Sequence, residues 1–301
     1  MNSNTGLPFI VHGQLPPLKE PSLVVMLNGW IDASGAAAAA METLVEATDS
    51  EILITFDSDT FIDYRARRPV MELRAGVNTR VNWVTPELRV GRDREGTDVL
   101  LLVGPEPDSN WKFFATTVAE LASQLGVRRM VGLGAYPYAA PHTRPVGVSI
   151  TTPDANVADR LSLAKNTVDV PAGVESVLEH ALFDRGTEVI GLWAQVPHYI
   201  ASMAYPAASA ALLTQLCDIS GLKVDVTPLR REATIQRERL DQLIVNNEEH
   251  LAMLHQMEAM YDSQNGAVSN SGEAPLTPGE LPSMEELAAE VEQFLRDQGT
   301  N

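Results

Sequence analysis

Polar and aromatic side chains follow several short apolar runs of this chain, in the positions where α/β proteins bind ligands. In open α/β sheets, ligands collect beyond the carboxyl ends of the strands. We therefore expect these side chains to meet at one edge of a sheet and to line a pocket or a partner-binding surface. The candidate residues are Gly29, Trp30, Asp32, Glu106, Trp111, Tyr136, Arg144 and Tyr199. Arg144 is the natural contact for an anion, because a guanidinium can donate two parallel hydrogen bonds to it.

The stretch "LNGWIDASGAAAAA" (27–40) has the outline of a phosphate-binding turn without its chemistry. A P-loop needs glycines five residues apart, followed directly by lysine and then serine or threonine. Here Gly29 and Gly35 are six residues apart, and Ala36 follows. Asp32 places a carboxylate near the start of the next helix, where it can cap the helix and complement its dipole. That charge repels a phosphate, so the turn is explained by packing and capping.

The sequence contains no recognisable catalytic or metal-binding pattern. In "DSDTFID" (57–63), Phe61 occupies the third ligand position of a calcium loop. The six histidines are dispersed, and His250 and His255 are badly spaced for a zinc pair. No G-x-S-x-G elbow is present, and the single Cys217 rules out a disulfide framework. We expect no catalytic residue, metal or cofactor, and a non-enzymatic role is favoured over an enzyme.

The elements that would position the candidate residues alternate between apolar runs and helical patterns. Nearly continuous apolar runs are typical of strands buried on both faces of a sheet. The expected strands are 23–27, 51–56, 98–104, 129–135 and 188–196, and the expected helices are 34–48, 110–125, 172–185 and 206–220. Residues 69–90 alternate in polarity, which predicts antiparallel strands or a hairpin. The pattern predicts a three-layer α/β/α sandwich with a mixed central sheet.

Composition divides the chain into a core domain at 1–228 and a C-terminal helical appendage. Residues 229–262 predict a long helix or a helical hairpin, and the Ser-, Gly- and Pro-rich segment 263–283 predicts a flexible linker. Residues 284–298 predict a terminal amphipathic helix. Its apolar stripe, a candidate interaction surface, consists of Met284, Leu287, Val291 and Phe294.

Charge and hydropathy exclude two classes of partner. The net charge is −18, and phosphate backbones need a basic face, so we expect no nucleic-acid partner. No run approaches the roughly 18 apolar residues of a membrane span, and the N-terminus has no signal-peptide pattern. We therefore expect a cytoplasmic protein with no membrane partner.

Four loop segments carry a resemblance to a known family. They are "LNGWIDASGAA", "FDSDTFIDYRARRPVMEL", "LLVGPEPDSNWKFFA" and "GLGAYPYAAPHTRPVGVS". Together these segments, in this order between Phe9 and Ser220, resemble the proteasome assembly chaperone family of the second-subunit type, in its longer actinobacterial branch. The resemblance implies a phosphorylase/hydrolase-like α/β/α sandwich and a chaperone that binds proteasome subunits without enzymatic activity. Several relatives use a C-terminal hydrophobic–tyrosine–any-residue tail, which Gly299, Thr300 and Asn301 do not match.

Two functional hypotheses follow. The first is a non-enzymatic, chaperone-like module that binds protein subunits, with proteasome-like subunits as candidate partners and self-association as a dimer or trimer. The second is a small-molecule-binding protein, or an enzyme of the nucleoside-phosphorylase or peptidase kind, that uses the loops at the carboxyl ends of the strands. The second hypothesis depends on fold-level analogy together with the aromatic and acidic loops.

Overall fold

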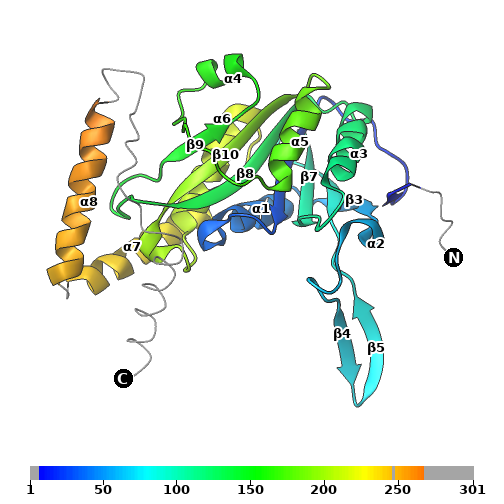
Figure 1. Ribbon diagram of the computed structural model, residues 1–301, viewed down its shortest axis with the longest axis horizontal. Coiled ribbons are helices and arrows are strands. Elements are labelled where there is room, and N and C mark those ends of the chain that lie inside the picture. The colour runs from blue at the N-terminus through cyan, green and yellow to red at the C-terminus, as the bar shows by residue number, and fades with distance from the viewer. Residues whose placement is uncertain (1–6, 246–247, 268–301) are drawn as a thin grey trace.

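The computed structural model describes residues 7–245 and 248–267, which form an α/β/α sandwich around a mixed sheet (Figure 1). The eight-stranded sheet has the order β1-β3-β6-β7-β2-β8-β10-β9. Its strands are β1 (Phe9–Val11), β2 (Ser22–Asn28), β3 (Glu51–Phe56), β6 (Glu87–Arg92), β7 (Asp98–Pro105), β8 (Arg129–Tyr138), β9 (Val148–Thr151) and β10 (Glu188–Pro197). The predicted fold class is confirmed.

The strand directions bring the candidate loops to one edge of the sheet. β2 runs parallel to β7 and β8, and β8 runs parallel to β10. β3 is antiparallel to β6, which is antiparallel to β7, so β3 points the same way as the other four. β3 nevertheless has only antiparallel neighbours, β1 and β6, and its Ile52 is exposed. The apolar run of β3 predicted a strand buried on both faces, and the exposure of Ile52 shows that this part of the prediction was wrong.

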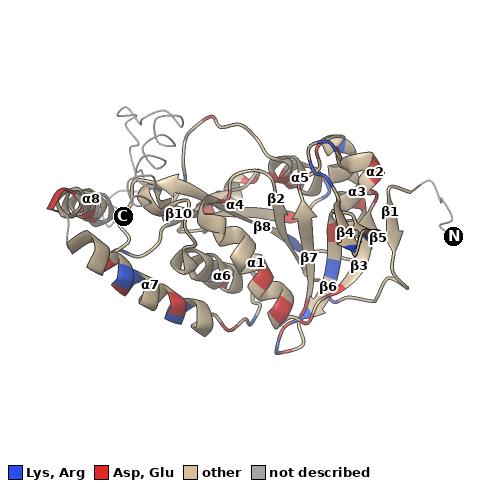
Figure 2. Ribbon diagram, turned by 90° about the horizontal axis from the view of Figure 1, so that it is seen from below, with Lys and Arg blue, Asp and Glu red and all other residues tan. Residues whose placement is uncertain are grey.

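Helices cover both faces of the sheet because alternate side chains of each strand point in opposite directions. Val24 and Met26 of β2 face α1 (Ala36–Ala47) and α6 (Pro206–Ser220), whereas Leu23 and Val25 face the opposite layer. That layer contains α3 (Trp111–Gln124) and α5 (Val174–Phe183). Figure 2 shows the two helical layers on either side of the sheet. The remaining short elements are η1 (Ala33–Gly35), α2 (Ser58–Phe61), α4 (Ala155–Arg160) and η2 (His198–Ile200).

A two-stranded hairpin stands apart from the sandwich. β4 (Val70–Arg74) and β5 (Val77–Asn82) pair with each other in a separate antiparallel sheet. Figure 1 shows this hairpin projecting away from the body of the protein. The prediction of antiparallel strands in residues 69–90 is confirmed, since β6 also pairs antiparallel with its two neighbours in the main sheet.

Two helices follow the core. α7 (Thr227–Val245) packs on α6, and α8 (Glu248–Ala267) lies beside the end of the sheet that carries β9 and β10 (Figure 1). Both signs of charge alternate along α7 (Figure 2). α8 extends beyond residue 263, where the sequence predicted the start of a linker. The expected terminal helix, with its stripe from Met284 to Phe294, lies outside the described residues. No helix in the described ranges is long and apolar enough to cross a membrane.

Candidate functional site

A pocket lies at the carboxyl edge of the sheet, between the loop after β2, the loop after β7 and the N-terminus of α5. We call it the rim pocket and define it by Trp30, Asp32, Glu106, Glu175 and Trp193. It is small, with a cavity volume of about 30 Å³, and it opens to solvent beside Trp30. Three of the eight predicted site residues line it, and a fourth, Gly29, lies against Glu106 at the same turn.

Two carboxylates of the rim pocket also hold helix N-termini. Asp32 Oδ1 accepts a hydrogen bond from the Ala37 amide at 2.8 Å, and Asp32 Oδ2 accepts one from the Ala38 amide at 3.0 Å. Glu106 Oε1 accepts one from the Val174 amide at the start of α5. Burial raises the pKa of Asp32 in spite of its bonds to the amides. The predicted capping by Asp32 is thus present, and Glu106 does the same for a second helix.

Glu175 is the unusual member of the rim pocket. Its Oε1 atom is buried and has no hydrogen-bond partner. Burial, together with the charges of Glu179 and Glu106, holds the pKa of Glu175 well above its ordinary value. The carboxyl group lies on the sheet at Gly132, where a Cβ atom would overlap Glu175 Oε1. Gly132 of the β8 sequence "RMVGLGA" therefore makes the room that an acidic side chain occupies.

Two tryptophan rings frame the rim pocket. The Trp193 ring covers Gly134, and a Cβ atom added at Gly134 would overlap that ring. The Trp30 ring packs on Gly173, where an added Cβ atom would lie only 2.9 Å from the ring. Trp30 remains 44% exposed. Aromatic rings held by glycine contacts and open to solvent on one side are well placed to contact a ligand.

Sequence reasoning missed Glu175 and Trp193. A glutamate in the first turn of a helix is ordinarily a partner of the helix dipole, and a tryptophan within an apolar strand is ordinarily part of the core. The available signal was the pair of glycines, Gly132 and Gly134, inside a predicted buried strand, because glycine there often marks a close approach by another group.

Two further predicted residues lie elsewhere along the same edge. Trp111 donates its indole N–H to the Pro107 carbonyl, which fixes the start of α3. The Tyr136 hydroxyl contacts Ser149 Oγ at 3.1 Å, Gln195 Nε2 at 3.1 Å and Asn166 Nδ2 at 3.2 Å. Neither side chain lines the rim pocket.

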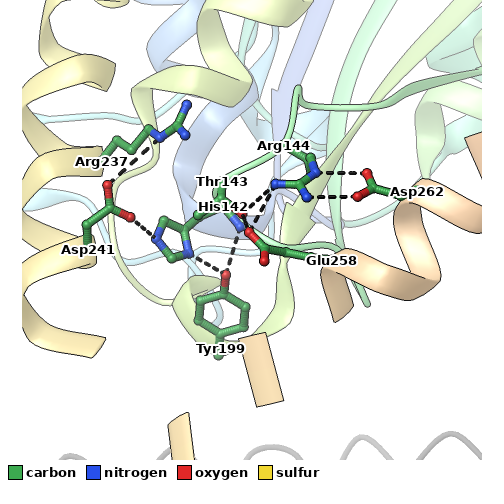
Figure 3. Close-up of polar contacts among 8 residues, drawn as sticks. All are labelled: His142, Thr143, Arg144, Tyr199, Arg237, Asp241, Glu258 and Asp262. Atoms are coloured by element: carbon green, nitrogen blue, oxygen red, sulfur yellow. Dashed lines mark hydrogen bonds and ion pairs between the residues drawn. The ribbon is translucent and has the colours of Figure 1, made fainter. Parts of the chain in front are cut away.

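Arg144 and Tyr199 belong to a second cluster that fastens α7 and α8 to the core, and we call it the clasp (Figure 3). Arg144 donates two parallel hydrogen bonds to Asp262 of α8, each 2.8 Å long, and a third to Glu258 at 3.0 Å. The anion that Arg144 contacts is therefore a carboxylate of the same chain. The clasp consists of His142, Thr143, Arg144, Tyr199, Asp241, Glu258 and Asp262.

His142 lies at the centre of the clasp, with both ring nitrogens engaged. Nδ1 is 2.7 Å from the Tyr199 hydroxyl and Nε2 is 3.1 Å from Asp241 Oδ1. Its side chain is wholly buried, and burial lowers the pKa of His142 although Asp241 opposes that shift. The Tyr–His–Asp arrangement therefore connects the segment after β8 to η2 and to α7.

The carboxyl group of Glu175 should cost stability at neutral pH. We expect Glu175→Gln to raise the free energy of unfolding by about 1–3 kcal/mol at pH 8 and to change it little at pH 4. A carboxyl with a raised folded pKa binds its proton more tightly in the folded state, so its unfavourable contribution appears as the pH rises above 4.5, its ordinary value. Urea unfolding at both pH values measures this. The exposed Glu46→Gln is the matched control, and an equal effect of Glu175→Gln at pH 4 and pH 8 would contradict the assignment.

The fold and the site together define an α/β/α sandwich protein with an acid-lined, tryptophan-framed pocket at the carboxyl edge of a mixed sheet. The chain belongs to the PAC2 family, whose model matches residues 26–244. The resemblance to the proteasome assembly chaperone family is thereby confirmed. The match spans β2 to α7, including both the rim pocket and the hairpin.

Solved structures agree with this assignment. A protein of unknown function from Mycobacterium tuberculosis, Rv2714, is 32% identical, with a TM-score of 0.80 over 89% of this chain and 96% of that one. The M. tuberculosis proteasome-assembly chaperone homologue Rv2125 is 28% identical, with a TM-score of 0.71 over 77% of this chain and 99% of that one. Pyrococcus furiosus PbaB, an archaeal proteasome activator, shares the fold at 17% identity, with a TM-score of 0.59 over 78% of this chain and 97% of that one. Among proteins with curated functions, none matches this chain significantly.

Proposed function

We propose that this protein is a non-enzymatic, chaperone-like module of the cytoplasm that binds other protein subunits, with proteasome subunits as the first candidates. Membership of the PAC2 family and similarity to a proteasome-assembly chaperone homologue support this role. Self-association as a dimer or trimer belongs to the same proposal. The observation within this chain that supports it best is the projecting β4–β5 hairpin.

The hairpin exposes apolar side chains that its own chain leaves uncovered. Val70 and Val77 are each 62% exposed, and Met71 and Leu73 are 52% and 51% exposed. Trp83, just after β5, packs against Tyr64 with ring centroids 4.7 Å apart and the rings tilted, and it is itself largely exposed. A two-stranded hairpin is marginally stable alone, and contiguous exposed apolar surface marks sites of protein contact. We propose that a partner subunit covers this surface.

Changing the apolar side chains of the hairpin should abolish partner capture without unfolding the core. The variant Val70→Thr, Met71→Thr, Leu73→Thr and Val77→Thr keeps residues that favour strands and removes most of the exposed apolar area. We expect at least a tenfold loss in capture of recombinant proteasome subunits from the same organism, measured by pull-down, and a smaller assembly by analytical ultracentrifugation if the hairpin also mediates self-association.

The control changes exposed valines elsewhere. Val168→Thr and Val170→Thr alter side chains that are 64% and 68% exposed in the loop before α5, and should leave capture unchanged. If the wild-type chain captures no proteasome subunit, that choice of partner is wrong. If the hairpin variant captures as well as the wild type, the partner binds another surface.

The second candidate function is binding of a small molecule in the rim pocket. The buried and unpartnered Oε1 of Glu175 favours it, because an uncompensated polar atom at a concave site costs free energy that a ligand can recover. This function and protein binding use different parts of the molecule, so both can operate in one protein.

A further inference from the structure

We propose that the rim pocket binds the ammonium group of a small organic amine, with Glu175 as its counter-ion and the rings of Trp30 and Trp193 as its walls. This inference rests on the second candidate function and is independent of protein binding by the hairpin.

The first step is the sign of the charge. The charged groups that line the rim pocket are all carboxylates, namely Asp32, Glu106 and Glu175. Asp32 and Glu106 are already hydrogen-bonded to helix amides, whereas Glu175 forms no ion pair among the described residues. Arg67 extends towards Gly29, but its guanidinium pairs with Asp108 at 3.0 Å. The pocket lining therefore offers acidic groups and no lysine or arginine, and Glu175 Oε1 has no hydrogen-bond partner. An anion would worsen this arrangement and a cation would relieve it.

The second step is the kind of cation. Within the described ranges, no three His, Cys, Asp or Glu side chains are arranged to hold a metal ion. The rim pocket instead combines its carboxyl group with two indole rings, and indole is the aromatic surface that attracts cations most strongly. The Glu175 carboxyl group beside the Trp30 and Trp193 rings suits an alkylammonium ion. The ammonium N–H groups would bind the carboxyl group, and the methylene groups would contact the indole rings.

The third step concerns why an acidic side chain occupies this position. Gly132 and Gly134 leave the space that Glu175 and Trp193 fill, and a Cβ at either glycine would overlap one of those side chains. A core built for stability alone would fill that space with apolar atoms, because a buried polar group without a hydrogen-bond partner is destabilising. A ligand that supplies the missing hydrogen bonds recovers that cost when it binds.

Isothermal titration with n-butylamine tests the inference at pH 8. We expect wild-type protein to bind it with a dissociation constant of about 1 mM or lower, as the size of such a ligand allows, and to bind n-butanol at least tenfold more weakly. Glu175→Gln should weaken amine binding at least tenfold, and the exposed Glu46→Gln should not. Trp30→Leu, a change at a ring that is 44% exposed, should weaken amine binding severalfold while leaving circular dichroism unchanged.

Three results would overturn the inference: no heat of binding up to about 10 mM amine, equal binding of amine and alcohol, or unaltered binding by Glu175→Gln. The pull-down of proteasome subunits, repeated with Glu175→Gln, separates the two proposals. If Glu175→Gln loses amine binding but still captures proteasome subunits, the amine and the protein partner bind at separate sites. If the wild-type protein binds no amine, this inference is wrong, but the pull-down result for protein binding is unaffected.

Discussion

Replacing His142 with alanine should release α8 and loosen α7 while the sheet stays folded. We expect the free energy that protects the amides of α7 and α8 from hydrogen exchange to fall by about 2–3 kcal/mol, a 30- to 150-fold faster exchange. Amides of β2, β7 and β8 should keep their protection. Hydrogen exchange followed by mass spectrometry, with peptides from each element, measures both.

The physical reason is the small apolar contact between α8 and the rest of the protein, whereas α7 also packs Leu229 and Leu240 against the main core. At α8, the buried apolar cluster consists of Ile244, Leu254 and Met257, with Tyr199 and Leu251 packed against it. Polar contacts of the clasp supply much of the remaining attachment, and the His142 side chain is the fully buried group that joins Tyr199 to Asp241. Removal of the imidazole deletes two hydrogen bonds and leaves a cavity. It also removes support for the loop that positions the neighbouring Arg144 against Asp262 (Figure 3).

His180→Ala provides the matched control, because this histidine is exposed on α5. It should change stability by no more than about 0.5 kcal/mol and leave the exchange of α7 and α8 unaltered. Equal loss of protection in every element after His142→Ala would show that the clasp supports the whole core. No change at all would show that apolar packing alone holds the appendage.

Gly29→Ala should destabilise the protein by about 2–4 kcal/mol and disrupt the rim pocket. Gly29 has a φ of +151°, which side-chain-bearing residues rarely adopt. A Cβ there would also lie 2.9 Å from both Glu106 Cβ and Arg67 Nη2. Relief of that contact must move the Glu106 carboxylate that caps α5, so amine binding should fall together with stability.

Gly35→Ala is the informative comparison because it changes a glycine of the same turn. Gly35 also has a positive φ, +63°, but a Cβ there meets nothing within 4 Å. We expect a loss of only about 1–2 kcal/mol from the left-handed backbone, with amine binding retained. Urea unfolding and amine titration of the two variants separate the effect of the close contact between residue 29 and Glu106 from the effect of the positive φ angle. Equal losses would mean that the contact with Glu106 contributes nothing.

Local patterns in the sequence were sufficient to predict the layers of this protein. Apolar runs separated by helical patterns predicted the strands and helices of the sandwich, and the alternation after Pro69 predicted the hairpin. The position of Asp32 just before an alanine-rich helix predicted its capping role, since a cap depends on residues only a few positions apart. The edge where Trp30, Asp32 and Glu106 meet followed from the same local signals and the rule that parallel strands end together.

Only the tertiary structure decided what each of those side chains contacts. Glu175 of α5 meets Gly132 of β8, and Arg144 meets Asp262 across 118 residues of sequence. Periodicity indicates which face of an element is buried, but not which element buries it. Arg144 had the right chemistry to bind an anion, but only the packing of α8 supplied that anion. Likewise, only the space above Gly132 gave the carboxyl group of Glu175 its position on the sheet. The sequence determined the elements and the edge, because these depend on near neighbours; the tertiary structure assigned the partners, because these depend on contacts between distant parts of the chain.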